Sequence, residues 1–455
     1  MTSLPPAPPP LSRAGRLTVL AVAFLGWLGA GVHMAITQQT GRAASVDLLG
    51  RTGALDPAVF VALNRRQEAA RVTPGAALAE ADATRLKGWE VRVARWFAWN
   101  QCAFLFGAAA GGLLFGWVGD RAGRSRAMAL SICTYSGFAA LAALVRSPEQ
   151  FVAAWFLACL GVGGMWPNGV ALVAEAWSGL SRPVAAGVIG TAANVGLFLG
   201  ATAAKVEPVT PDHWRWMTLV GAAPLLLGVF ALWGVPESPQ WLAARAAPPD
   251  APAAAARAGA VFRPPLLWLT LVGIVLATTP VVGGWGTANW MTPWAEKAGG
   301  AALRADVLQV RALTGILGSL LGGWIASAAG RRATYFLVSL ASLLTAQYIF
   351  WFLVPTDRWF LTWVAVLGFV SGIYFGWLPL CLPELFPTRV RSTGAGVSFN
   401  FGRILTATTL FASGALMGHF GGDYARIGRV TGLFFVFGMV AVLFAPDTSE
   451  KPLAD

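Results

Sequence analysis

The chain has 455 residues, of which 56% are hydrophobic and only 12% charged, and its formal net charge is +12. Soluble domains carry about 25% charged residues, so this composition excludes an ordinary soluble globular protein. The basic excess does not indicate nucleic-acid binding, because no compact soluble basic domain is present to carry it. The four cysteines fall in apolar stretches without metal-ligand spacing, so we expect no metal, no cofactor and no disulfide.

Long uncharged apolar stretches recur along the whole chain. About 20 such residues cross a bilayer as an α-helix, and the pattern predicts an all-α membrane protein with twelve transmembrane helices. Strands of a membrane barrel are not expected, because these stretches are solidly apolar rather than alternating. The predicted spans cover residues 17–36, 96–118, 127–145, 151–174, 183–204, 216–235, 265–295, 312–329, 333–355, 359–383, 394–418 and 430–446.

The segments between the spans predict how the chain is divided. The first span ends without a convincing cleavage site, which favours a retained helix over a signal peptide. Residues 37–95 form an extracytoplasmic insertion of mixed charge with few Gly or Pro, and we expect it to be largely helical. An Ala- and Pro-rich stretch predicts a linker between two halves. The divisions are a tail, the first half, the linker, the second half and a second tail, at 1–16, 17–242, 243–264, 265–446 and 447–455.

An even number of spans places both termini on the same side of the membrane. Arginine is enriched in the loops on that side, for example at Arg121, Arg124 and Arg126, and the positive-inside rule then predicts cytoplasmic termini. We expect a multi-pass protein of the cell (inner or plasma) membrane that acts as a monomer. Its expected partners are the lipid bilayer, a small-molecule substrate and, if transport is coupled, protons.

An internal repeat relates the two halves. Four residues of the loop after the second span recur at one constant offset in the loop after the eighth: Gly116, Trp117, Gly123 and Arg124 correspond to Gly323, Trp324, Gly330 and Arg331. Three residues after the fourth span recur in the same way: Glu175, Arg182 and Gly187 correspond to Glu384, Arg391 and Gly396. Two six-span halves related by duplication are typical of transporters.

Four stretches carry a resemblance to the major facilitator superfamily. The loop "GWVGDRAGR" at 116–124 resembles its signature between spans two and three, and "PESPQWL" at 236–242 resembles the sugar-porter motif. The stretches "GVGGMWPNGVALVAEAW" at 161–177 and "PELFPTRVRSTGAGVSFNFGR" at 383–403 resemble the metabolite:proton symporter branch. The resemblance covers all twelve spans. It implies two pseudo-symmetric six-helix bundles that transport by alternating access, and not an enzyme.

Two departures from that branch concern coupling. Its members often carry an Asp in the first span, where this chain has "GWLGAGVHMAI". They also often carry an Arg early in the fourth span and an acidic residue after its "GG", where this chain has "WFLACLGVGG" and Met165. Because these positions are tied to proton coupling or substrate binding in relatives, both uniport and proton symport stay open here.

Charged residues at the helix ends predict a cytoplasmic gate. Asp120 near a neighbouring helix N-terminus would meet a favourable dipole, and arginines could bridge to Glu175 and Glu237. The alternative is a solvated turn that only sets topology. In the second half Ser327 replaces the Asp, which predicts a weaker gate or one carried by Glu384. The expected gate residues are Gly116, Asp120, Arg121, Gly123, Arg124, Glu175, Arg182, Glu237, Arg331, Arg332, Glu384 and Arg391.

Arg403 is the most informative single residue of the sequence. It lies about nine residues, or ~14 Å, into the eleventh predicted span, where burying an Arg costs about 2.5–3.5 kcal/mol. No Asp or Glu lies comparably deep in a predicted span. The functional interpretation is a cation for an anionic substrate, with Asn400 on the same helix face to complete a carboxylate site. The structural interpretation is an Arg satisfied by helix-end carbonyls.

Other polar and aromatic residues of the spans complete the expected substrate site. His33 titrates near neutral pH and is the candidate for proton coupling as well as for substrate contact, although such a His is also a common packing residue. The remaining candidates could instead join helices. They are Trp166, Asn168, Asn194, Trp285, Asn289 and Tyr374. We therefore expect a secondary or facilitative carrier of a small organic solute, a carboxylate or other organic anion. The alternatives are a carrier of sugars or other neutral metabolites and a transport-derived sensor without flux.

Overall fold

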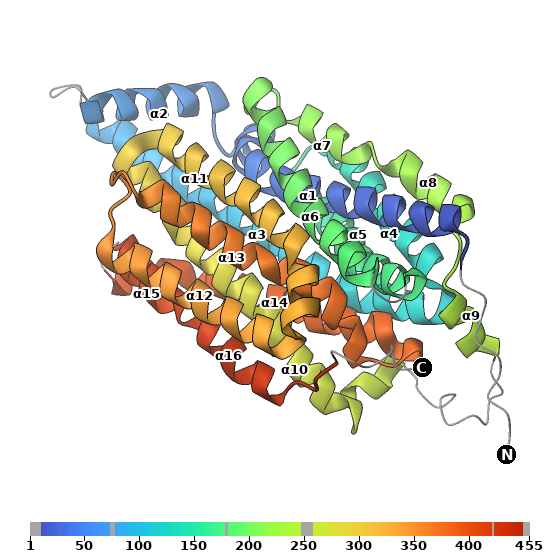
Figure 1. The fold of residues 1–455 in the computed structure, drawn as a ribbon. Coiled ribbons are helices and arrows are strands. Elements are labelled where there is room, and N and C mark those ends of the chain that lie inside the picture. The colour runs from blue at the N-terminus through green and yellow to red at the C-terminus, as the bar shows by residue number, and fades with distance from the viewer. Residues whose placement is uncertain (1–10, 73–77, 178–180, 247–257, 421–422, 449–455) are drawn as a thin grey trace, which may run out of the picture.

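The protein is described here by a computed structural model, which covers residues 11–72, 78–177, 181–246, 258–420 and 423–448. In these ranges the chain is helical, apart from turns and one isolated bridge between Thr210 and His213. The helices lie side by side in a single elongated bundle, as Figure 1 shows.

The first half contains nine helices among the described residues. They are α1 (Arg13–Arg51), α2 (Pro57–Val72), α3 (Glu80–Ala122), α4 (Arg124–Ala142), α5 (Pro148–Ala176), α6 (Ser181–Val206), α7 (Arg215–Ala222), α8 (Leu225–Gly234) and α9 (Pro239–Ala246). The sixth predicted span is formed by α7 and α8 together. It is interrupted at Pro224, which has no backbone N–H to continue the helix.

The second half begins with a short 3₁₀ helix, Ala258–Phe262, and contains seven α-helices among the described residues. They are α10 (Leu266–Thr279), α11 (Trp285–Ala329), α12 (Arg331–Phe352), α13 (Phe360–Cys381), α14 (Arg391–His419), α15 (Tyr424–Gly432) and α16 (Phe434–Phe444). A π-helical turn, Pro280–Gly284, joins α10 to α11. Two 3₁₀ helices, Pro383–Leu385 and Thr388–Val390, precede α14.

The predicted spans have helical counterparts throughout. In the described part of the chain, ten helical segments are long and apolar enough to cross a membrane. The third and eleventh predicted spans correspond to two further helices, α4 and α14. The all-α architecture of the prediction is therefore confirmed, and α14 is the helix that carries Arg403.

The chain reverses direction within α11, although its residues are helical throughout. The Arg311 guanidinium donates a hydrogen bond of 2.9 Å to the Gly284 carbonyl, 27 residues earlier in the sequence. A straight helix would separate these residues by ~40 Å, so α11 must fold back on itself. Its returning part, Asp306–Ala329, is the eighth span. This span begins before the predicted start at residue 312, and Arg311 therefore lies inside it rather than in a loop.

The insertion between the first two spans is an extension of α1 and α3. These helices have 39 and 43 residues, far more than a bilayer requires. Beyond the main bundle they enclose a small apolar core with α2, formed by Val46, Leu49, Leu55, Phe60, Leu63, Leu86, Trp89 and Val93. In Figure 1, α2 lies at one end of the molecule, and α9 and the start of α1 lie at the other. We call the latter end the terminal end.

Small residues allow the two halves to approach closely. Helix α3 packs against α14, and α6 packs against α11 and α13. A Cβ atom added at Gly116 on α3 would lie 2.9 Å from the Ser392 carbonyl oxygen at the start of α14. In the other half, a Cβ at Gly323 on α11 would lie 2.2 Å from the Pro183 carbonyl oxygen at the start of α6. The two contacts are related by the internal repeat, which places equivalent loops at equivalent ends of the bundles.

Candidate functional site

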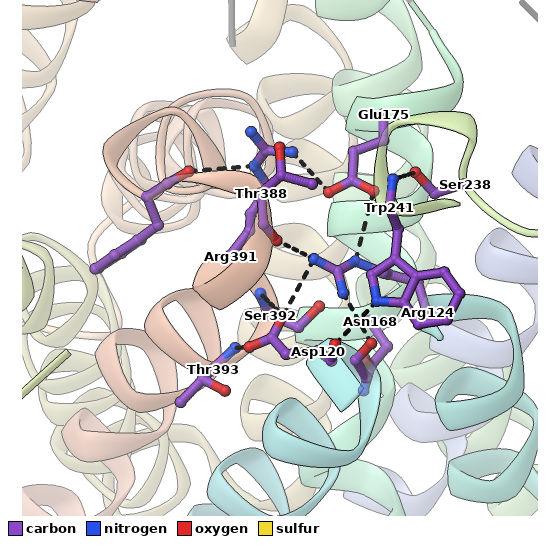
Figure 2. Close-up of polar contacts among 12 residues, drawn as sticks. Asp120, Arg124, Asn168, Glu175, Ser238, Trp241, Thr388, Arg391, Ser392 and Thr393 are labelled. Carbon is purple, nitrogen blue, oxygen red and sulfur yellow. Dashed lines mark hydrogen bonds and ion pairs between the residues drawn. The ribbon is translucent and has the colours of Figure 1, made fainter. Parts of the chain in front are cut away.

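A group of charged residues joins the two halves at the terminal end, and Figure 2 shows the contacts of Asp120, Arg124, Glu175 and Arg391. We call Asp120, Arg124, Glu175, Glu237 and Arg391 the charged cluster. The Asp120 carboxylate accepts hydrogen bonds from the backbone N–H groups of Ser392, at 3.1 Å, and Thr393, at 2.8 Å. These amides begin α14 and have no partner inside that helix, so a carboxylate there is stabilised by hydrogen bonds and by the helix dipole. Asp120 of the first half thus caps a helix of the second half.

Arg124 begins α4 directly after Gly123, whose φ of 112° is a backbone conformation that glycine adopts without strain. Its guanidinium is fully buried and lies 3.1 Å from Asp120 Oδ1. It also lies 3.5 Å from Glu175 Oε2 and donates to the Gly119 carbonyl at 2.8 Å. A further N–H donates to the Thr388 carbonyl in the second half. Arg124 therefore neutralises two carboxylates of its own half and binds the backbone of the other.

Glu175, at the end of α5, lies between arginines of both halves. Its Oε1 is 2.6 Å from Arg391 Nη1, and neither side chain is exposed to solvent. Arg391 also donates to Gln240 Oε1 at 3.2 Å and, through Nε, to the Phe386 carbonyl at 3.3 Å. A buried ion pair is costly to break on one side only, because the remaining charge stays buried without its partner. This pair is consequently a strong connection between the halves as long as the terminal end is closed.

Glu237 belongs to the "PESPQWL" motif and binds the start of α4. It accepts hydrogen bonds from the backbone N–H groups of Arg124, at 3.0 Å, and Ser125, at 3.2 Å. Burial raises the pKa of the Glu237 carboxyl above its ordinary value, while these amides and Arg124 oppose that effect. Trp241 of the same motif donates through Nε1 to the Asp120 carbonyl at 2.9 Å. The motif therefore fastens the loop that carries Asp120 and Arg124.

The corresponding loop of the second half is built differently. Ser327, at the position equivalent to Asp120, accepts a hydrogen bond of 3.1 Å from Arg331 Nη1. Arg331 also forms an ion pair of 3.3 Å with Glu384, and Arg332 donates to the Ala445 carbonyl at 2.6 Å. The helix start that this loop approaches has Pro183, which has no N–H, where α14 has Ser392. Both the carboxylate and an amide donor of the first-half contact are thus missing here.

One predicted gate residue, Arg121, lies apart from these contacts, and another has a side chain that the structure does not describe. The Arg121 side chain is exposed, and its guanidinium carbon lies 5.3 Å from the centre of the Trp117 ring. The Arg182 side chain lies outside the described part of the structure.

Arg403 lies in the middle of α14, and only 4% of it is exposed. Its guanidinium carbon is 5.7 Å from the ring centre of Phe104 on α3 and 5.4 Å from that of Phe399 on α14. Its Nη1 is buried without a hydrogen-bond partner in the described structure. Ring faces stabilise a cation by about 0.5–2 kcal/mol, which is less than a carboxylate partner provides. Arg403 therefore holds a charge that no described carboxylate neutralises.

The two rings beside this guanidinium come from different halves, and further rings pack against Phe399. Phe399 stacks on Trp166 of α5 with 4.0 Å between ring centres, and Trp27 of α1 meets Phe399 edge-on at 6.4 Å. We call Arg403, Phe399, Phe104, Trp166 and Trp27 the central group. Of these residues the sequence indicated only Arg403 and Trp166. The other rings gave no distinct signal, because aromatic residues are common in every apolar span; for Phe399 the one signal that could have been used is its spacing, one helical turn before Arg403.

Asn400 lies one turn from Arg403 on the same helix. Its amide nitrogen donates to the Gly396 carbonyl at 3.0 Å and to the Gly163 carbonyl of α5 at 3.4 Å. Its carbonyl oxygen is buried without a partner among the described residues. The amide therefore holds α14 against α5 and retains one free acceptor. An anion would not bind that acceptor, so Asn400 would contribute to an anion site only if its amide turned to present an N–H group.

Two candidate asparagines form hydrogen bonds to neighbouring helices. Asn168 donates to the Phe115 and Gly164 carbonyls, each at 2.9 Å, and lies beside the charged cluster in Figure 2. Asn194 of α6 donates to Ser319 Oγ of α11 at 3.5 Å and so bridges the two halves. The structure does not bring either amide into the described contacts of Arg403.

His33 and Tyr374 lie inside their own halves. The His33 ring packs between Tyr135 and Trp155, with Nδ1 2.9 Å from the Gly29 carbonyl oxygen and Nε2 3.3 Å from that of Tyr135. The Tyr374 hydroxyl donates to Ser339 Oγ at 2.7 Å. Neither ring is among the described contacts of the central group. The side chains of Trp285 and Asn289 lie outside the described residues.

Comparison with known proteins agrees with this architecture. A model of the Major Facilitator Superfamily matches residues 88–409. The chain is 28% identical over 361 residues to the cis,cis-muconate transport protein of Acinetobacter baylyi, covering 76% of this chain and 84% of that protein. It is also 28% identical over 349 residues to the "Probable 4-methylmuconolactone transporter" of Cupriavidus pinatubonensis, covering 75% and 79%.

Solved structures share the fold at low sequence identity. The proton:xylose symporter XylE, bound to 6-bromo-6-deoxy-D-glucose, superimposes with a TM-score of 0.70 at 18% identity, covering 97% of this chain and 98% of that chain. The human organic anion transporter MFSD10 gives a TM-score of 0.66 at 18% identity, covering 94% and 99%. The helices, the repeated loops and these matches lead to one conclusion: the chain belongs to the major facilitator superfamily, and is a multi-pass membrane transporter with twelve helices in two bundles.

Proposed function

We propose that this protein carries a small organic anion, a carboxylate, across the cell membrane by alternating access. The observation that carries the proposal is Arg403, a buried guanidinium without a described carboxylate partner at the junction of the two halves. An unpaired charge at this depth is costly, and a substrate carboxylate would remove that cost by forming charge-assisted hydrogen bonds. The rings of Trp166 and Phe399 would contact the apolar part of the same molecule.

Two relatives support an anion. One is a transporter of cis,cis-muconate, and the other is named for 4-methylmuconolactone; both compounds are small organic acids. A sugar carrier is the second candidate, since the structural neighbour XylE transports xylose. A guanidinium without a carboxylate partner favours the anion, because a neutral sugar would leave the charge of Arg403 uncompensated.

The charged cluster would act as the cytoplasmic gate, with both termini in the cytoplasm. Asp120 and Glu175 of the first half bind α14 and Arg391 of the second half, so the described conformation would be closed to the cytoplasm. Opening toward the cytoplasm would separate these contacts and release a substrate held at Arg403. The contacts of the second-half loop, at Ser327 and Pro183, are weaker, so separating them would cost less free energy than separating those of the first-half loop.

Proton symport and uniport differ in what His33 would do. Both of its ring nitrogens face backbone carbonyl oxygens, so a neutral ring donates to one of them and a protonated ring donates to both. Protonation would therefore improve the hydrogen bonding of this buried ring, although burial of the charge opposes it. If uptake follows an imposed pH gradient, His33 is the first residue to substitute, because both carbonyls could accept from a protonated ring.

The test is uptake into liposomes that contain the purified full-length chain. Radiolabelled carboxylates should enter faster than into empty liposomes, and labelled sugars should not. Arg403→Gln should reduce carboxylate uptake by at least about tenfold, because a charged hydrogen bond contributes about 1.5–3 kcal/mol. Arg126→Gln, which removes an exposed Arg at the terminal end, is the matched control and should leave uptake unchanged.

Three results would contradict the proposal. They are uptake of sugars but not of carboxylates, unchanged carboxylate affinity in Arg403→Gln, and no solute movement at all, which would favour a sensor. A pH gradient imposed in the same liposomes separates symport from uniport.

A further inference from the structure

A second arginine lies inside the membrane-spanning part of the second half. Arg311 belongs to the returning part of α11 and is partly buried. Its backbone packs against α13, because a Cβ added at Gly368 would lie 3.1 Å from the Arg311 Cα. Its guanidinium donates to the Gly284 carbonyl at 2.9 Å. Because Gly284 is buried, this contact shows that the guanidinium points into the bundle and not toward the lipid.

The carbonyl that Arg311 binds belongs to the π-helical turn Pro280–Gly284. Such turns are rare and are frequently found at functional sites, because they displace the backbone from regular helical bonding. The Gly284 oxygen also accepts from Thr287 Oγ1 at 3.0 Å, so its hydrogen-bonding capacity is filled. On the other side of this glycine, an added Cβ would meet no described atom within 4 Å. The turn is thus buried, and no described atom occupies the space next to Gly284.

The charge of Arg311 is not neutralised by any described residue. A guanidinium has five N–H donors, and in the described structure a single one of them, on Nη2, makes a hydrogen bond to the protein. No ion pair joins Arg311 to a described carboxylate. Helix α14, which carries Arg403, packs against the same π turn. Two guanidiniums without described carboxylate partners therefore lie on helices that share this turn.

We propose that Arg311 is a second anion-binding residue on the substrate path, and that the carrier selects dicarboxylates over monocarboxylates. This inference rests on the proposed transport of organic anions through Arg403. One substrate carboxylate binds Arg403, and the other binds the free N–H groups of Arg311 beside the π turn. A dianion satisfies both charges, whereas a monoanion leaves one of them without a partner. The competing role is a purely structural one, in which Arg311 only holds the π turn against α11.

The experiment compares matched substrates in liposomes. The probes are straight-chain dicarboxylates from succinate to suberate, together with cis,cis-muconate, and each is paired with its monomethyl ester. The wild-type chain should take up at least one diacid with a KM at least about tenfold below that of its monoester, as expected for one additional charged hydrogen bond. In Arg311→Gln the ratio of the monoester KM to the diacid KM should fall to about one, while monoester uptake is retained. Arg311→Lys should keep part of the preference, because it keeps the charge.

Arg358→Gln is the control, since Arg358 is an exposed arginine of the same half, and it should leave the ratio unchanged. An unchanged ratio in Arg311→Gln would overturn the inference. So would an equal loss of diacid and monoester uptake together with a lower melting temperature, which is the result of a structural role. If the wild-type chain carries monocarboxylates alone, the inference fails and the anion proposal stands. If it carries no carboxylate, the anion proposal itself fails.

Discussion

Individual buried charges define the two important places in this protein. Glu175 and Arg391 are fully buried and lie 2.6 Å apart, and Arg124 approaches the same carboxylate from the other side. Here every charge has a partner of opposite sign. At Arg403 and Arg311 the described structure offers no carboxylate, so under the proposed function both positive charges would be available to a substrate. Paired charges suit a contact between the halves, and unpaired charges suit a ligand.

Glu175→Gln should destabilise the described conformation more than other carboxylate substitutions do. The change leaves Arg391 and Arg124 without their shared anion in a site with no solvent exposure, and breaking one side of a buried pair costs about 3–5 kcal/mol. The melting temperature of the purified protein measures the effect. Glu149→Gln, at an exposed position on the same helix, should change stability by no more than about 0.5 kcal/mol. Equal melting temperatures for the two variants would show that the Glu175 pair contributes nothing.

At the scale of elements, helix pairs in this protein approach at glycines. A Cβ atom added at Gly111 of α3 would lie 1.9 Å from the Leu160 carbonyl oxygen of α5. In return, a Cβ at Gly163 of α5 would lie 1.9 Å from the Ala108 carbonyl oxygen of α3. Helices in lipid associate through such close packing, because lipid supplies no hydrophobic driving force between them. The position of α5, and of Trp166 on it, therefore depends on these small residues.

Gly111→Ala should destabilise the protein by about 1–3 kcal/mol, because the new methyl group overlaps a backbone oxygen that cannot move aside. Gly137→Ala on α4 is the matched control. Its Cβ would meet no described atom within 4 Å, and replacing Gly by Ala inside a helix gains up to about 1 kcal/mol. Thermal unfolding in detergent would compare the two variants. If both substitutions move the melting temperature in the same direction by the same amount, close packing at Gly111 does not stabilise the protein.

The whole molecule has two different ends. The helical extension formed by α1, α2 and α3 lies at one end, and the charged cluster and α9 lie at the other, as Figure 1 shows for α2 and α9. The proposed orientation places the charged cluster in the cytoplasm and α2 outside. The contacts between halves described at the terminal end would then make this an outward-facing or occluded conformation of the alternating-access cycle.

Cysteine labelling tests this orientation in a chain whose four native cysteines are replaced by alanine. Arg66→Cys on α2 should react with a membrane-impermeant maleimide in intact cells, because Arg66 is exposed at the end proposed to lie outside. Arg245→Cys on α9, also exposed, should react after permeabilisation and not before. The reverse pattern would show that the termini lie outside and that the charged cluster closes the other side.

The sequence by itself determined the class of molecule. Twelve apolar stretches, the repeated loops and the isolated Arg403 are local or periodic signals, because apolar length and uncompensated charge are properties of single segments. Helix ends were less well determined, and the early start of the eighth span concealed Arg311 in an expected loop.

Only the tertiary structure decided which side chains meet. Glu175 and Arg391 are 216 residues apart in the chain, and their contact depends on how two helix ends come together across the halves. The direction in which a side chain points from its helix also depends on how the helices pack. This packing places His33 and Tyr374 inside their bundles and Arg403 between the bundles. An apolar helix offers no polar face from which that direction could be predicted, because lipid and protein interior are equally apolar.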